Sequence, residues 1–205
     1  MQFIEFKQNL EKFIVFNLND IRKIEADFDL RRLDEWKEKG YLKMVTRGYY
    51  IFGGTEVNES VLSLIANTIY EPSYISLELA LSRYNLIPES VYSITSVTSK
   101  KTQTFETEFG RFSYRRIKPT LLFGYKLVDF GGRRFRLAEI EKAVLDYLYL
   151  NPHLKDVPDF EEARLNILAF REGADIVKFR TYLSRYENAS FKRRAEKFLD
   201  YISHD

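Results

Sequence analysis

The stretch that decides the fold covers residues 27–52 and reads DFDLRRLDEWKEKGYLKMVTRGYYIF. Leu30, Leu33 and Trp36 recur at helical spacing, so we expect a helix that turns this apolar stripe toward a core. Gly40 follows the stripe, and glycine is the usual residue just beyond a helix end. The stretch therefore begins with a short amphipathic helix, which an aspartate in front of it can cap.

Two β-rich runs follow, residues 41–45 and 49–52, and the Thr-Arg-Gly turn between them predicts a hairpin. Upstream, apolar residues at helical spacing predict a first helix over residues 3–13. A second, short helix is expected to start at Asn19 or Asp20, whose side chains can accept hydrogen bonds from free amides. Three helices followed by a hairpin is the order of elements in a winged helix-turn-helix.

The rest of the chain predicts a second, larger unit. We interpret the glycine pair at residues 53–54 as a hinge between an N-terminal unit of residues 1–56 and a C-terminal unit of residues 57–205. From residue 91 to 137, β-branched and aromatic runs alternate with turn signals, and helical periodicity returns from residue 138 onward. Strands bracketed by helices predict an α+β fold, with an antiparallel sheet flanked by helices.

Composition and charge limit the classes of protein to which the chain can belong. The chain has no cysteine, which excludes disulfides and thiolate metal sites and fits a reducing compartment. The sequence shows no apolar run of membrane-spanning length and no signal-peptide core in residues 1–16, so we expect a cytoplasmic protein without a membrane partner. Its net charge is +2, and residues 1–56 carry ten basic and ten acidic side chains. Affinity for a polyanion therefore depends on where the charges lie.

The predicted winged helix carries a DNA-binding hypothesis, because the third helix of this motif enters the major groove and the wing contacts the backbone. The candidate contacts are Arg31, Arg32, Lys37, Lys43, Arg47 and Tyr49. Arg31 turns outward on the predicted helix and is the leading candidate. Tyr49 and Tyr50 alternate along the wing, so we expect one of them to face solvent. The acidic residues on the same helix favour the alternative of a winged helix used for protein contact.

A second group of basic residues lies downstream and is a candidate nucleic-acid surface. Basic and aromatic residues interleave there, as in sheets that bind nucleic acid, but a sheet with one wet face gives the same pattern. Because neighbours along a strand point to opposite faces, one of two consecutive arginines must be buried, paired or on a functional surface. The group consists of Lys100, Lys101, Arg115, Arg116, Lys118, Arg133 and Arg134.

The sequence predicts no catalytic site, no metal site and no cofactor. Neither of the two histidines has an obvious partner, and the sequence contains no phosphate-binding glycine loop or zinc-ligand spacing. Glu139, Glu141 and Asp146 gather on one predicted helix, but Lys142 stands at the i, i+4 position relative to Asp146. We interpret this face of the helix as solvated and salt-bridged.

Several segments, taken in order, carry a family resemblance. They are residues 16–50, PSYISLELAL at 72–81, YNLIPE at 84–89, the strand at 95–101, FGY at 123–125 and AEIEKAVLD at 138–146. As a set they resemble the AbiEi family of abortive-infection antitoxins. The resemblance covers most of the chain to about residue 150 and is weakest over the final helices.

The resemblance implies a recognition helix at residues 29–39 and a wing at residues 43–50 that bind inverted repeats in the protein's own promoter and repress it. It also implies a C-terminal domain that antagonises a nucleotidyltransferase-like toxin in a type IV toxin–antitoxin system, without a stable complex between the two proteins. It implies no catalytic residue. The alternative function is a non-catalytic module that binds RNA or protein through the basic surface of the C-terminal domain.

Overall fold

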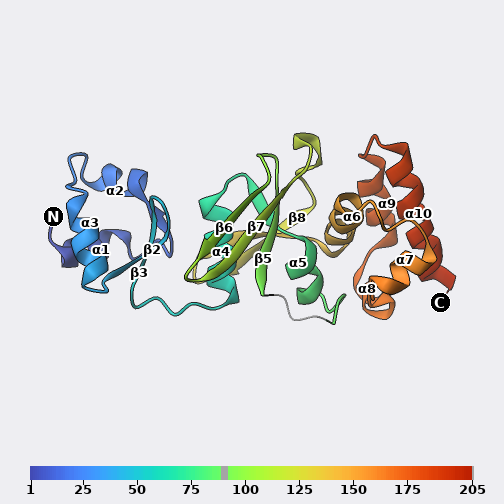
Figure 1. Cartoon of the computed structure of the whole chain (residues 1–205), viewed down its shortest axis with the longest axis horizontal. Coiled ribbons are helices and arrows are strands. Elements are labelled where there is room, and N and C mark those ends of the chain that lie inside the picture. Colours follow the sequence, from blue (N-terminus) through green and yellow to red (C-terminus); the bar gives the residue numbers. More distant parts are fainter. Residues whose placement is uncertain (89–91, 205) are drawn as a thin grey trace.

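The computed structural model describes residues 1–88 and 92–204 and has the α+β fold that the sequence predicts. Three regions follow one another along the long axis: a small N-terminal unit, a sheet and a group of C-terminal helices (Figure 1). One cluster of buried apolar side chains lies inside the N-terminal unit, and a larger cluster runs through the sheet and the C-terminal helices. The fold therefore has two cores.

The N-terminal unit contains three helices and a three-stranded antiparallel sheet with the strand order β1, β3, β2. The first helix is three residues shorter than predicted. The second starts earlier than predicted because Asn17 caps it, accepting hydrogen bonds from the Asn19 and Asp20 amides, while the Asp20 carboxylate accepts one from the Asn17 amide. The elements are α1 (Phe3–Leu10), β1 (Phe16–Asn17), α2 (Leu18–Ile24), α3 (Arg31–Glu38), β2 (Leu42–Thr46) and β3 (Tyr49–Phe52).

Aromatic side chains fill the core of the N-terminal unit. Leu33 and Trp36 of α3 are 3% and 5% exposed, and the Trp36 ring lies against Phe3 and Phe6. Trp36 is thus a core residue, as its place on the predicted stripe indicates. The stripe is wrong at its first position, because Leu30 precedes the first turn of α3 and is 42% exposed.

Residues 59–88 and 92–138 contain a six-stranded sheet with the strand order β6, β7, β5, β4, β9, β8 and two helices packed on it. The pairs β4–β9 and β5–β7 are parallel, so the prediction of an antiparallel sheet is wrong for them. Turn signals predict hairpins between consecutive strands, whereas each of these two pairs joins strands that are not consecutive in the chain. The elements are α4 (Glu59–Ile69), β4 (Ser73–Ile75), α5 (Leu77–Arg83), β5 (Ser93–Thr98), β6 (Gln103–Thr107), β7 (Gly110–Arg116), a 3₁₀ turn (Pro119–Leu121), β8 (Tyr125–Phe130) and β9 (Arg133–Ala138).

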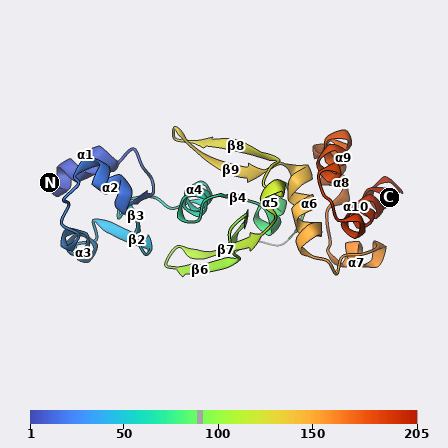
Figure 2. The same ribbon diagram turned by 90° about the horizontal axis from the view of Figure 1, so that it is seen from above.

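The helices α4 and α5 cover opposite faces of this sheet. The Thr95 hydroxyl donates to the Ser76 carbonyl oxygen just before α5, at 2.7 Å. Ser96 points to the other face and is the register partner of Tyr114, whose hydroxyl donates to the Ala66 carbonyl oxygen of α4 at 2.8 Å. Figure 2 shows α4 between the hairpins β6–β7 and β8–β9, with α5 and the C-terminal helices beyond the sheet.

Further helices follow, and two arginines, one from α10 and one from the sheet, bind carbonyl oxygens at the end of α6 and in the loop after it. Arg194 donates to the carbonyl oxygens of Leu148 and Leu154 at 3.1 and 2.7 Å, and Arg115 of β7 donates to that of Leu150 at 2.6 Å. Carbonyl groups at a helix end lack helical partners and favour cations, so these contacts fix the end of α6. The helices are α6 (Ile140–Leu150), α7 (Val157–Glu162), α8 (Ile167–Gly173), α9 (Ile176–Ser184) and α10 (Ala189–His204).

The small sheet of the N-terminal unit is covered on both faces. Along β3, Tyr50 and Phe52 belong to the N-terminal core, whereas Tyr49 and Ile51 pack into the larger core. Ile51 is completely buried, as is expected for a residue between two packed layers. The hairpin therefore joins the two units instead of projecting freely from the first.

Candidate nucleic-acid interface

The outer face of α3 lies at the end of the molecule, away from the large sheet (Figure 1). The Arg31 side chain is 88% exposed, but its Nη2 lies 3.2 Å from Oδ2 of Asp29 and its Nε donates to Oδ1 at 3.2 Å. This hydrogen bond raises the pKa of Arg31 and lowers the pKa of Asp29. Arg31 is accessible to a phosphate, which would have to replace Asp29 as its partner.

The other two basic candidates on α3 are less accessible. Arg32 is half-buried, donates a hydrogen bond to the Met1 carbonyl oxygen and lies 6.0 Å from the centre of the Trp36 ring. The Lys37 side chain is 30% exposed, and its Nζ lies 2.7 Å from Oδ1 of Asp34, which raises the pKa of Lys37. Both side chains therefore have partners inside the N-terminal unit.

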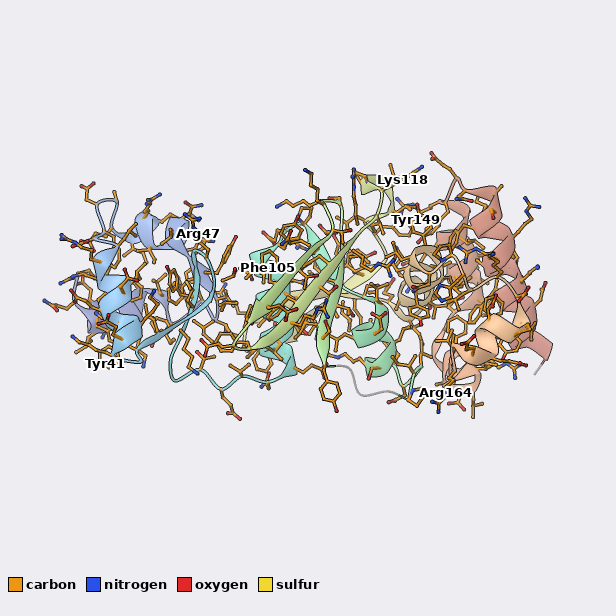
Figure 3. All side chains as sticks on the ribbon, in the orientation of Figure 1. Tyr41, Arg47, Phe105, Lys118, Tyr149 and Arg164 are labelled. Carbon is orange, nitrogen blue, oxygen red and sulfur yellow. The ribbon has the colours of Figure 1, made fainter. Side chains whose placement is uncertain are left out.

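The hairpin turn carries Arg47, the predicted DNA-contact residue that is least engaged by other side chains among the described residues. Arg47 is exposed at the margin of the N-terminal unit (Figure 3) and has no carboxylate partner within the described part of the chain. Lys43 is also exposed, but its Nζ lies 3.8 Å from Oε2 of Glu108 and 5.7 Å from the centre of the Phe109 ring, both in the β6–β7 turn. Arg47 is therefore the stronger candidate on the hairpin.

Neither tyrosine of the hairpin faces solvent, so that expectation is wrong. Tyr50 is 8% exposed inside the N-terminal core. Tyr49 is half-buried against the larger core, where burial raises its pKa. The expectation assumed a wing with one wet face, whereas the larger unit covers that face. Tyr49 is consequently a packing residue with limited access to DNA.

Arg22, which is not among the residues predicted from the sequence, is an exposed residue of α2 that forms no ion pair within residues 1–88 and 92–204. The hairpin turn packs beside α2, because Gly48 neighbours the Leu18 side chain. Arg22 and Arg47 thus belong to adjacent segments. Arg22 lies in the last turn of a short helix, where the helix dipole favours basic residues. This position is visible in the sequence, but it does not distinguish a structural role of Arg22 from a functional one.

The seven downstream basic residues lie in three separate places. The first is where β5 and β7 end, the second is the end of α6, and the third is the β8–β9 hairpin. Arg133 in this hairpin donates to the Lys12 carbonyl oxygen at 2.6 Å and lies over the Phe13 ring, so it joins the two units. Of the two consecutive arginines, Arg115 is held at the end of α6 and Arg116 is exposed. The ends of β5 and β7 carry Lys100, Lys101, Arg116 and Lys118, the end of α6 holds Arg115, and the β8–β9 hairpin carries Arg133 and Arg134.

The face of α6 that we expected to be solvated is buried, so that prediction is wrong. Lys142 and Asp146 are both 0% exposed and form an ion pair. Asp146 also accepts hydrogen bonds from the hydroxyls of Tyr74 and Ser76, at 2.8 and 2.9 Å, and Lys142 donates to the Tyr186 hydroxyl at 3.2 Å. The α9–α10 region packs over this side of α6, and helical periodicity alone cannot reveal such a cover.

Aromatic rings complete the surroundings of the Lys142 ammonium group. The ring centres of Tyr74, Phe123 and Tyr186 lie 5.1 to 5.7 Å from its Nζ. Burial lowers the pKa of Lys142 and raises the pKa values of Tyr74 and Tyr186 well above their usual range. We interpret this buried network as a structural centre of the C-terminal unit.

The carboxylates at the start of α6 bind groups of the α9 region. Glu139 Oε1 lies 2.8 Å from the Nζ of Lys178, and Glu141 accepts a hydrogen bond from the Asp175 amide at 2.9 Å. Among the residues that the structure describes, no three histidine or acidic side chains are grouped as a metal site requires. In the same ranges no helix has the length and apolar character needed to cross a membrane.

A groove of about 680 Å³ opens on the sheet face opposite α4. Ser93, Thr95 and Ser113 lie along its floor, and their hydroxyls are typical of a polar binding surface. Arg111 and Arg115 supply positive charge, while Glu78 and Glu162 on the flanking helices offset it, so the groove has no dominant charge. Its lining also includes Leu77, Ile87, Tyr92, Tyr147 and Ala163.

Arg22 on α2 and Arg47 in the hairpin turn are therefore exposed arginines without a carboxylate partner in the described ranges, while the outer face of α3 has mixed charge. Glu35 and Glu38 are exposed on that face together with Arg31. Such an arrangement can bind phosphates from the helix margins while the acidic groups limit non-specific attraction. Neither the protein-family models nor the curated proteins with which the sequence was compared contain a match to it.

Proposed function

We propose that the protein is a DNA-binding repressor of its own promoter and the antitoxin of a type IV toxin–antitoxin system, as in the AbiEi family. The proposal treats the N-terminal unit as a winged helix-turn-helix. One observation carries it: Leu33 and Trp36 anchor α3 to the N-terminal core, which leaves the opposite face of that helix exposed at the end of the molecule. The proposed activity is non-catalytic, needs no cofactor and belongs in the cytoplasm.

In this proposal α3 enters the groove, and Arg47 and Arg22, on adjacent segments, bind backbone phosphates. Both arginines are exposed and have no carboxylate partner within the described residues, so no ion pair has to be broken before they bind. Arg31 adds a contact when a phosphate or a guanine edge replaces Asp29. Lys37 and Lys43 contribute less, because Asp34 and Glu108 already hold them.

Fluorescence anisotropy tests the repressor function. The wild-type protein is titrated at several salt concentrations against a duplex from its upstream region and against a scrambled duplex. Arg22→Ala and Arg47→Ala should each weaken binding and reduce the slope of log affinity against log salt by about 0.9. The matched control is Arg180→Ala, an exposed arginine of α9 that pairs with Glu196, and it should change neither quantity.

Two results would contradict the repressor function. One is equal affinity of the wild-type protein for the upstream and scrambled duplexes. The other is an Arg180→Ala effect as large as that of Arg47→Ala, because the surface would then lie elsewhere. An RNA-binding function of the C-terminal unit, which the exposed Lys100, Lys101 and Arg116 would favour, predicts full RNA affinity in the Arg22→Ala, Arg47→Ala double variant.

The antitoxin function is tested by co-expression with the nucleotidyltransferase-like toxin that we expect to be encoded beside it. The double variant, expressed from an independent promoter, should protect cells from the toxin as well as the wild type does. Both arginines lie in residues 1–56, whereas the resemblance assigns protection to residues 57–205. Growth arrest in the presence of the wild-type protein would remove this half of the proposal, and a stable complex in a pull-down would remove the type IV assignment.

A further inference from the structure

We propose that the free edge of β8 pairs with β8 of a second copy of the chain, so that two repressor molecules form a two-fold contact. β8 is the last strand of the sheet order, and β9 is its only strand partner within the described residues (Figure 2). All six residues of β8 pair with β9 in unbroken register, and none of them is proline. A regular edge strand of this kind is a template for another strand.

Hydrogen bonds beside β8 show which of its backbone groups point outward. The Glu139 amide donates to the Gly124 carbonyl oxygen at 2.9 Å, so these residues form a hydrogen-bonded pair at the end of the β8–β9 ladder. Such pairs alternate along an antiparallel ladder with pairs whose backbone groups point away from each other. The Arg136 amide fits this alternation, because it donates to Oδ1 of Asn67 at 2.6 Å and not to its register partner Leu127.

It follows that Tyr125, Leu127 and Asp129 direct their N–H and C=O groups toward the free edge. A two-fold axis at Leu127 would pair this residue with its own copy and Tyr125 with Asp129, giving about six hydrogen bonds between the strands. The Tyr125 hydroxyl can donate to the opposite carboxylate. A register centred on Lys126 would instead place two lysines opposite each other, which is unfavourable.

The side chains at this edge favour a partner strand. Leu127 and Tyr125 are 53% and 37% exposed, so the middle of the strand presents apolar surface that pairing would bury. The other edge of the sheet is less suitable. β6 contacts β2 of the N-terminal unit, and its exposed residues Gln103, Thr104 and Glu106 are polar. The contact rests on the proposed function in one respect, because inverted repeats bring two subunits together in two-fold symmetry.

Cysteine cross-linking tests the pairing without DNA. The natural chain has no cysteine, so Leu127→Cys introduces the sole thiol. Its Cα would lie about 5.5 Å from that of its copy, within the range for a disulfide. Mild oxidation should give a dimer on a non-reducing gel, whereas Thr104→Cys at the other edge should stay monomeric. Failure of Leu127→Cys to cross-link, or equal cross-linking of both variants, would overturn the proposal.

A charge swap tests the same contact on DNA, with a single-site and a two-site duplex. Leu127→Lys should bind the single-site duplex as the wild type does and lose about tenfold in affinity for the two-site duplex. An equimolar mixture of Leu127→Lys and Leu127→Glu should restore that affinity, because opposite charges then face each other. Wild-type affinity of Leu127→Lys for the two-site duplex would refute the pairing. Absence of binding to the single-site duplex by the wild type would refute the repressor function instead, and the cross-linking result would still decide the pairing.

Discussion

The Lys142–Asp146 pair allows a direct test of how the C-terminal unit is held together. Lys142→Met keeps the length of the side chain but removes its charge, so within the described residues the buried Asp146 carboxylate retains only the Tyr74 and Ser76 hydroxyls as side-chain donors. Removal of one partner from a buried ion pair costs about 3–5 kcal/mol. At about 2–4 °C per kcal/mol for a chain of this size, the melting temperature should fall by about 6–20 °C.

Urea denaturation with two optical signals measures this cost. Far-ultraviolet circular dichroism reports on all helices, whereas fluorescence of Trp36, the sole tryptophan, reports on the N-terminal unit. Lys142→Met should shift the dichroism transition more than the fluorescence transition. The control Lys118→Met, which removes an exposed partner of Glu187, should leave both midpoints close to the wild type.

A double variant tests whether the loss of stability comes from the unpaired buried charge. Lys142→Met with Asp146→Leu removes both charges from the interior, so it should be more stable than Lys142→Met alone. A loss below about 1 kcal/mol for Lys142→Met would show that water or a rearrangement satisfies the carboxylate. A double variant as unstable as the sum of the two single variants would show that the two side chains do not interact.

Two further predictions concern the same unit. Gly124→Ala should cost about 1–3 kcal/mol in urea denaturation, because Gly124 has a φ of +72° and an added Cβ would lie 3.0 Å from Lys142 and Tyr182 side-chain atoms; wild-type stability would show that this loop adjusts freely. Burial raises the pKa of Tyr114 well above its usual value, so its hydroxyl stays neutral in the folded protein while the unfolded chain ionises from about pH 10. The stability that Tyr114 contributes is therefore complete below pH 10 and is lost as the pH rises further, with a slope of about 1.4 kcal/mol per pH unit. Because the buried Tyr74 and Tyr186 also contribute to the fall in the free energy of unfolding above pH 10, Tyr114→Phe should make this fall less steep between pH 10 and 11 without abolishing it. The variant should also cost about 1 kcal/mol at pH 8 through the lost hydrogen bond to the Ala66 carbonyl oxygen; an unchanged slope would contradict the raised pKa of Tyr114.

Local sequence signals sufficed for the elements of the N-terminal unit. Leu33 and Trp36 mark the buried side of α3, and Gly40 ends that segment with a φ of +71°, as glycine at this position predicts. The failures there are also local. Leu30 fits the apolar spacing but lies before the first turn of the helix. Asn17 acts as the cap because its side chain reaches two amides, and neighbouring Asn19 looks equally suitable in the sequence.

Longer-range features could not be predicted from periodicity. β4 has three residues, Ser73–Ile75, and its parallel pairing with β9 depends on strands about sixty positions apart. The second face of the hairpin is covered by the larger unit, which buries Ile51 and half-buries Tyr49. The DNA-contact candidates changed for the same reason: Glu108, distant in the chain, holds Lys43, whereas Arg47 has no carboxylate partner in the described ranges.

The contacts around Lys142 bear on what the family resemblance means. Three of the segments that carry it, residues 72–81, 123–125 and 138–146, meet in the buried network, where Tyr74 and Ser76 bind Asp146 and Phe123 lies over Lys142. Residues that are buried together constrain the fold, because a change in one leaves another without a partner. These segments therefore support the architecture more strongly than the choice of operator or toxin. In the proposed function that choice belongs to exposed side chains outside this centre, such as Arg22, Arg31 and Arg47, which explains why mutations at the two places should separate stability from DNA binding.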